Sequence, residues 1–85
     1  MNLVFKESAL KDLRYWASTN PSTSRKILSL LEDIERNPFS GIGNPKPLRF
    51  DYAGCWSRRI DGAHRLVYRV SDGSIEIISC RYHYR

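Results

Sequence analysis

Residues 38–47 contain three prolines and two glycines, and this segment limits the possible fold more than any other part of the chain. Proline fixes φ and lacks an amide hydrogen, so the segment cannot form a helix or a central strand. We expect a stiff loop instead. Before the loop, apolar residues recur mainly with helical spacing. After it, they alternate as strand residues do, with turn residues between the runs.

The chain before the loop is predicted to form one strand and two helices. A short β-prone run predicts a strand over about residues 2–6. The first helix is expected to be capped by Ser8 and to reach about Ser18, where Asn20-Pro21 stops it. Ser22 is expected to cap a second helix that ends before Asn37-Pro38. The short joint between the helices indicates a helical hairpin.

Each predicted helix has an apolar stripe that is expected to lie in the core. The spacing that defines such a stripe is i, i+3, i+4 and i+7. The stripe of the first helix contains Leu10, Leu13 and Ala17, and that of the second contains Ile27, Leu30, Leu31 and Ile34.

The chain after the loop is predicted to form four strands, at about residues 48–50, 55–61, 64–70 and 74–82. Asp61-Gly62 and Asp72-Gly73 are typical of the tight turns of β-hairpins. The element order β-α-α-β-β-β-β predicts an α+β fold, with an antiparallel-dominated sheet and the helical hairpin packed on one face. At 85 residues, the whole chain, 1–85, is expected to be a single domain.

Strand alternation is expected to collect positive charge on the open face of this sheet. In the strand at 55–61, Trp56, Arg58 and Ile60 share one side, while Arg59 lies on the other with Ser57. Residues 46–85 contain eight of the fourteen Lys and Arg residues but four of the nine Asp and Glu residues, so they hold most of the net charge of +5. Arginine suits phosphate recognition, and a solvated basic face is the simpler alternative.

Several classes of protein and site are not expected. No apolar stretch approaches the roughly 20 residues of a membrane span, and the charged start does not resemble a signal peptide, so we expect a cytoplasmic protein. His64 and His83 are too far apart in sequence, and no Cys or His spacing resembles a zinc site, so no metal or cofactor is predicted. Cys55 and Cys80 are expected to be reduced thiols.

Phosphodiester cleavage in RNA requires neither a metal nor a nucleophilic side chain, because the 2′-hydroxyl attacks the adjacent phosphate. The protein must remove one proton, stabilise the phosphorane and protonate the leaving 5′-oxygen. Arginine can stabilise the phosphorane, and a histidine can donate the proton at cellular pH. His83, near the carboxyl end, is therefore a candidate donor, whereas His64 is expected to be a turn or structural residue.

Many residues between positions 38 and 84 closely resemble the YoeB family of the RelE/ParE superfamily, which are toxins of bacterial type II toxin–antitoxin systems. The matching segments are Pro38-Phe39-Ser40-Gly41-Ile42-Gly43, Trp56-Ser57-Arg58-Arg59-Ile60, His64-Arg65-Leu66-Val67-Tyr68 and Cys80-Arg81-Tyr82-His83-Tyr84. The resemblance implies a ribosome-dependent endoribonuclease, or mRNA interferase, that cleaves mRNA in the A site of the 70S ribosome. It also implies a YefM-type antitoxin and a toxin homodimer.

The resemblance also implies roles for individual residues. Arg65 would stabilise the phosphorane, His83 would be the general acid, and Tyr84 would orient or stack on a nucleotide. Arg59 and Arg49 would bind mRNA phosphates, with Arg49 standing where these toxins usually have lysine.

Lys46 departs from the family pattern, because family members usually have a glutamate there that is taken as the general base. A protonated lysine cannot accept a proton. Neighbouring arginines favour the neutral amine, whereas bound phosphates favour the charged one. Lys46 is therefore either a base or an electrostatic support. The alternatives are a catalytically weakened toxin, or a non-enzymatic protein that binds ribosome, RNA or antitoxin, or that inhibits gyrase as ParE toxins do.

Overall fold

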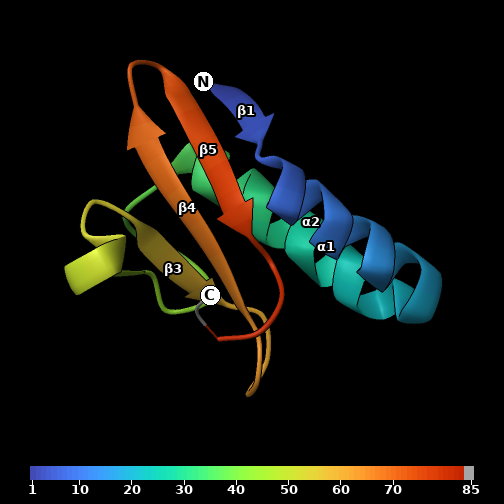
Figure 1. Ribbon diagram of the computed structural model, residues 1–85. Coiled ribbons are helices and arrows are strands. Elements are labelled where there is room, and N and C mark those ends of the chain that lie inside the picture. The colour runs from blue at the N-terminus through green and yellow to red at the C-terminus, as the bar shows by residue number, and fades with distance from the viewer. Residues whose placement is uncertain (84–85) are drawn as a thin grey trace.

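Two helices pack against one face of a five-stranded sheet in the computed structural model, which describes residues 1–83 (Figure 1). The elements, in chain order, are β1 (Asn2–Phe5), α1 (Glu7–Thr19), α2 (Pro21–Arg36), β2 (Lys46–Pro47), the 3₁₀ helix η1 (Phe50–Tyr52), β3 (Trp56–Arg59), β4 (Arg65–Ser71) and β5 (Ser74–Ser79). The strand order is β1-β5-β4-β3-β2, with β1 parallel to β5 and the other neighbours antiparallel. The predicted α+β fold is confirmed.

A single residue, Asn20, caps both helices of the hairpin. Its backbone N–H donates to the Trp16 carbonyl at the end of α1, and its side-chain oxygen accepts from the Thr23 N–H at the start of α2. Pro21 occupies the first turn of α2, where its missing N–H has no consequence. The predicted caps were therefore wrong: α1 begins at Glu7, before Ser8, and α2 begins at Pro21, before Ser22.

The core lies between the helices and the sheet, and the predicted stripe of α2 is fully confirmed. Its four members Ile27, Leu30, Leu31 and Ile34 are all buried.

The predicted stripe of α1 was wrong at two of its three positions. Leu13 is half-buried against the core, but Leu10 and Ala17 are exposed, and the buried positions are Ala9, Asp12 and Trp16. The cause lies far away in sequence, since Asp12 accepts a hydrogen bond from the Cys80 N–H and Trp16 donates one to the Cys80 carbonyl. These partners allow polar atoms of α1 to enter the core.

The proline-rich loop is held against the sheet by Arg58, whose side chain is fully buried. The guanidinium group forms an ion pair with Asp33 of α2. It also donates to loop carbonyls, those of Asn37 at 2.7 Å and of Ser40 and Ile42 at 3.0 Å. A buried arginine needs such partners, and here they fix the course of the loop.

Two strand boundaries differ from the prediction. The strand expected at 48–50 is instead β2 at Lys46–Pro47, and Phe50 has a left-handed φ of 57° and begins η1. Proline is tolerated in β2 because this strand is at the sheet edge. The last strand ends at Ser79 rather than at residue 82, because the peptide groups of Cys80 bond to side chains of α1.

Both predicted turns connect the expected strands, but only Asp72-Gly73 is a tight two-residue turn, because residues 60–64 all lie between β3 and β4. Asp72 and Gly73 connect β4 and β5 with φ values of 44° and 77°, as a two-residue turn of the hairpin type requires. The Asp61-Gly62 turn joins β3 to β4 and is described with the site below. Cys55 and Cys80 are buried and are not joined in a disulfide. Neither helix within residues 1–83 is long and apolar enough to cross a membrane.

Candidate RNA-binding and cleavage site

Two arginines lie directly opposite each other on the sheet face that is turned away from the helices. Arg59 ends β3 and Arg65 begins β4, and the strand register pairs their Cα atoms. Residues paired in this way have Cβ atoms about 5 Å apart, and like charges at that separation repel each other. The arrangement is destabilising unless an anion neutralises it, so it favours a site for phosphate.

The charge of this pair is not neutralised within the described part of the chain. Ion pairs in residues 1–83 join Asp33 to Arg36 and Arg58, and Glu76 to Lys6 and Arg69. Arg59 and Arg65 have no carboxylate partner among these residues. The two acidic groups that are paired both have a lowered pKa, chiefly because Arg58 donates to Asp33 and Arg69 donates to Glu76.

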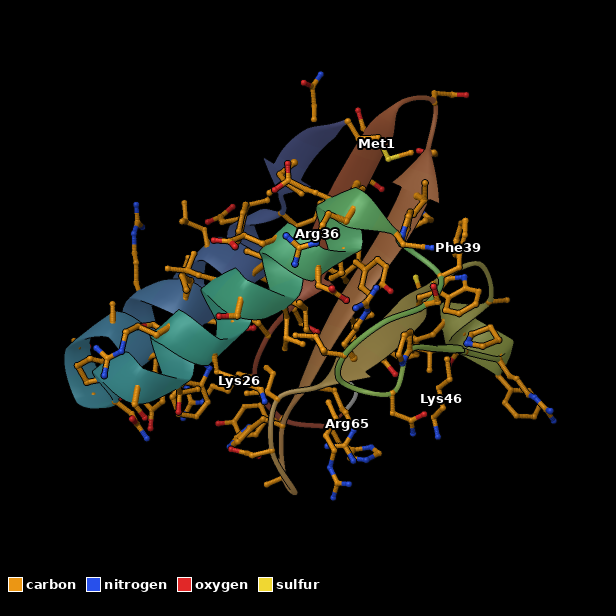
Figure 2. The ribbon with its side chains drawn as sticks, turned by 180° about the vertical axis from the view of Figure 1, so that it is seen from behind. Met1, Lys26, Arg36, Phe39, Lys46 and Arg65 are labelled. Atoms are coloured by element: carbon orange, nitrogen blue, oxygen red, sulfur yellow. The ribbon has the colours of Figure 1, made fainter. Side chains whose placement is uncertain are left out.

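Lys46 lies on the same face, one strand further toward the edge. It is paired with Ser57, which precedes Arg59 by two residues and shares its face. Two strand spacings and two residues separate Lys46 from Arg65, or roughly 12 Å between Cα atoms. Figure 2 shows both side chains extending toward the bottom of the view, at the same end of the molecule.

The guanidinium group of Arg65 is oriented by the turn that precedes β4. One of its terminal nitrogens donates to the carbonyls of Asp61, at 2.6 Å, and His64, at 3.0 Å. The turn is itself fixed, since the Asp61 carboxylate accepts from the N–H groups of Ala63 and His64, each at 2.8 Å. Arg65 is thus half-buried, and the turn holds its guanidinium group in place.

The carboxyl-terminal segment passes beside Arg65. The Tyr82 carbonyl accepts a hydrogen bond from the Arg65 backbone N–H at 2.9 Å, and the Tyr82 N–H donates to Nδ1 of His64 at 2.7 Å. His83 follows directly and is exposed. The structure therefore brings the backbone of His83 next to the first residue of β4. Tyr84 lies outside the described residues.

Arg49 lies apart from this cluster. It caps η1, beyond the end of β2, and its side chain is exposed. Together with Leu48 and the three η1 residues it lines a cavity of about 300 Å³. Phe50 in this cavity wall is 90% exposed, so the region presents an apolar surface beside one cation.

A second cavity, of about 410 Å³, lies between α1 and the carboxyl-terminal segment. Arg81 in its wall is stacked between two rings, 3.5 Å from the centroid of Tyr15 and 4.6 Å from that of Tyr82. Cation–π stacking of this kind fixes the segment just before His83.

Nowhere in residues 1–83 do three His, Cys, Asp or Glu side chains gather closely enough to hold a metal ion.

Two structural residues, Arg58 and Asp12, were missed in the sequence, and the contact of the expected structural residue His64 with Tyr82 was not predicted. Arg58 was placed on the correct face, but its role in holding the loop was not predicted. A sequence signal existed, because an arginine that alternates with Trp56 and Ile60 is expected to be buried and to need a carboxylate, such as Asp33. No local signal links Asp12 to Cys80, or His64 to Tyr82.

The arrangement can bind a polyanion and supply acid–base groups beside it. Arg59, Arg65 and Lys46 offer donors on one face, and His83 follows the anchored Tyr82. Cys55 is not a candidate nucleophile, since burial raises the pKa of its thiol.

Comparisons with known proteins agree with this fold. The family model described as YoeB-like toxin of bacterial type II toxin–antitoxin system matches residues 5–84. Toxin YoeB of Escherichia coli K12 is 46% identical over 84 residues, which are 99% of this chain and 100% of that protein.

Solved structures give the same picture. A YoeB/ParE toxin from Agrobacterium tumefaciens has a TM-score of 0.96 and 45% identity, over 99% of this chain and 100% of that chain. The Staphylococcus aureus YoeB dimer and YoeB–YefM complex have TM-scores of 0.91 and 0.90, at 42% and 44% identity. Each covers 99% of this chain and 98% of that chain.

Proposed function

Since the chain belongs to the family of YoeB-like toxins of bacterial type II toxin–antitoxin systems, we propose that it is a ribosome-dependent mRNA endonuclease that inhibits translation. It cleaves A-site mRNA by attack of the 2′-hydroxyl on the adjacent phosphate, with no metal. The observation that carries this proposal is the opposed pair Arg59 and Arg65, which has no carboxylate partner among residues 1–83 and lies beside the anchored Tyr82.

The reaction forms a bond between the 2′-oxygen and phosphorus and breaks the bond to the 5′-oxygen. The products are a 2′,3′-cyclic phosphate and a 5′-hydroxyl end. The guanidinium group of Arg65 stabilises the phosphorane, in which negative charge is greatest. His83 gives a proton to the leaving 5′-oxygen, and Tyr84 orients a nucleotide. Arg59 and Arg49 bind phosphates of the mRNA.

Lys46 takes the place of the family's glutamate, and we assign it the proton of the 2′-hydroxyl. The support is its position on the same sheet face as Arg59 and Arg65, next to the proposed phosphate-binding pair. Among the steps of the reaction, the removal of this proton is the one whose rate depends most on whether position 46 carries a carboxylate or an amine.

The proposed partners are a YefM-type antitoxin, a second copy of the toxin, and the 70S ribosome with its mRNA. A YoeB dimer and a YoeB–YefM complex exist for the Staphylococcus aureus relative. The acidic or phosphate-rich partners suit the net charge of +5. We further propose that residues 1–85 form one toxin domain and that it acts in the cytoplasm.

A second candidate is a catalytically weakened or non-enzymatic toxin that binds the ribosome, RNA or antitoxin, or that inhibits gyrase. Lys46 is the observation that favours it, because a lysine that stays protonated binds phosphate but removes no proton.

Cleavage of mRNA on programmed ribosomes tests the first proposal against the second. We expect the wild-type protein to cut the A-site codon and His83→Ala to cut it on the order of 10²–10⁴-fold more slowly. Transcripts left equally intact by both proteins would exclude the nuclease. A parallel gyrase supercoiling assay would then identify a gyrase inhibitor.

A further inference from the structure

We propose that His64 is a positioning residue that holds the carboxyl-terminal segment and thereby sets the place of His83 relative to Arg65. This inference rests on the proposed nuclease function. Its starting point is a contact between residues 18 apart in sequence: the Tyr82 N–H donates to the imidazole Nδ1 of His64 at 2.7 Å. The neighbouring Arg65 N–H donates to the Tyr82 carbonyl at 2.9 Å. Adjacent residues of β4 and its turn therefore hold both backbone polar groups of Tyr82.

Tyr82 needs such contacts because its backbone is in an unfavourable conformation. Its φ is 64°, in the left-handed region that residues other than glycine seldom adopt. A backbone of this kind persists where its surroundings determine it, and it commonly occurs next to functional groups. This left-handed backbone lies directly before His83 and next to the start of β4.

The imidazole of His64 is itself held in a defined orientation. The backbone N–H of His64 donates to the Asp61 carboxylate, and the His64 carbonyl accepts from the Ile60 N–H at 3.0 Å. The ring packs edge-on against Trp16, with 4.8 Å between the ring centroids and 80° between the planes. Contacts that do not involve Tyr82 therefore fix the position of the acceptor atom Nδ1.

The residues before Tyr82 are also attached through side chains rather than through the sheet. Asp12 accepts from the Cys80 N–H at 3.0 Å, and Trp16 donates to the Cys80 carbonyl at 2.8 Å. Arg81 is then stacked on Tyr15, and His64 holds Tyr82, the residue directly ahead of His83. An error of about 1 Å in the place of a reacting group can reduce a rate on the order of 10²-fold.

The chemistry of the contact defines which side chains can replace His64. A ring nitrogen that accepts a hydrogen bond carries no proton, so the ring N–H is at Nε2. Asparagine can place an acceptor oxygen near the position of Nδ1. Phenylalanine keeps an aromatic ring against Trp16 but has no acceptor.

The experiment compares wild type, His64→Asn and His64→Phe as full-length proteins. Single-turnover cleavage on programmed ribosomes gives the rate and the KM, and NMR gives the hydrogen exchange of the Tyr82 amide and the ¹⁵N shifts of His64. We expect His64→Phe to cleave on the order of 10–100-fold more slowly with little change in KM, and to lose protection of the Tyr82 amide. His64→Asn should recover most of both properties.

Several results would overturn the positioning role. These are an Nδ1 that carries the proton in the wild type, equal amide protection in the wild type and His64→Phe, or lost protection with unchanged cleavage. If His64→Phe does not fold, the ¹⁵N shifts and His64→Asn still decide the question. If the wild type does not cleave mRNA, the proposed function fails, whereas the two NMR measurements still test whether His64 holds Tyr82.

Discussion

Arg58 and Arg59 are neighbours in β3, and the pleat of the strand gives them opposite environments. Arg58 is fully buried against α2 and donates to Asp33, Tyr68 and the loop carbonyls. Arg59 is exposed on the other face, opposite Arg65. One arginine therefore belongs to the framework of the loop and the other to the phosphate-binding surface.

Replacing Arg58 by alanine should destabilise the fold by about 3–5 kcal/mol, because it removes the fully buried partner of the Asp33 ion pair and leaves the loop carbonyls without their donor. Burial raises the pKa of the Tyr68 hydroxyl, so it remains a donor to the Pro38 carbonyl, but it loses its contact with Arg58. Urea unfolding measures the change. Arg59→Ala is the matched control and should stay within about 0.5 kcal/mol of the wild type. Equal losses in both variants would contradict the assigned roles.

The ion pair of Asp33 should make stability depend on pH in a defined range. Hydrogen bonds from the Arg58 guanidinium and the Ile42 N–H hold the pKa of Asp33 below its ordinary value of 3.8. The unfolded chain therefore takes up the proton first, and the stabilisation is present above about pH 3.8 and lost as the pH falls through the folded-state pKa. We expect wild type to exceed Asp33→Asn in unfolding free energy at pH 7, with the difference shrinking below pH 4. A difference that is constant with pH would exclude the pair as its source.

Arg65→Ala should reduce the rate of mRNA cleavage on the order of 10²–10³-fold, because it removes the group assigned to the phosphorane. It should change the free energy of unfolding little, since the lost hydrogen bonds to the Asp61 and His64 carbonyls are offset by relief of the repulsion from Arg59. Single-turnover cleavage and urea unfolding measure the two effects. Arg69→Ala is the control, because Arg69 lies in the same strand but is paired with Glu76. If the cleavage rate falls equally in both variants, the loss of one positive charge explains the effect, and the specific role of Arg65 is contradicted.

The sequence predicted those parts of the fold that depend on local geometry. Strand pleating placed Arg58 and Arg59 on opposite faces, and helical spacing identified the buried stripe of α2. The stripe of α1 was wrong because contacts with Cys80, more than 60 residues away, bury Asp12 and Trp16. Periodicity contains no information about such partners.

In the site too, contacts between residues distant in sequence could not be predicted from local patterns. Strand alternation gave the faces of Arg59 and Arg65, but a two-residue Asp61-Gly62 turn would pair Arg59 with His64, so their direct pairing was not accessible from the sequence. The attachment of Tyr82 to His64 was not accessible, because it depends on a left-handed backbone and on how the segment after β5 crosses β4. Arg49 was grouped with the site by resemblance alone, and the structure places it at the start of η1, beyond the end of β2.

The role of Lys46 can be decided by comparing the pH–rate profiles of wild type, Lys46→Ala and Lys46→Glu. Lys46 shares its face with Arg59 and Arg65, so a neutral amine there can take the 2′-hydroxyl proton. We expect the wild-type cleavage rate to rise with pH along a limb that is absent from Lys46→Ala. In Lys46→Glu the limb should occur at lower pH, because a carboxylate loses its proton more readily than an ammonium group. Because Lys46 is an exposed residue of an edge strand, the variants should unfold as the wild type does. Equal rates in all three proteins at every pH would show that position 46 takes no part in proton transfer.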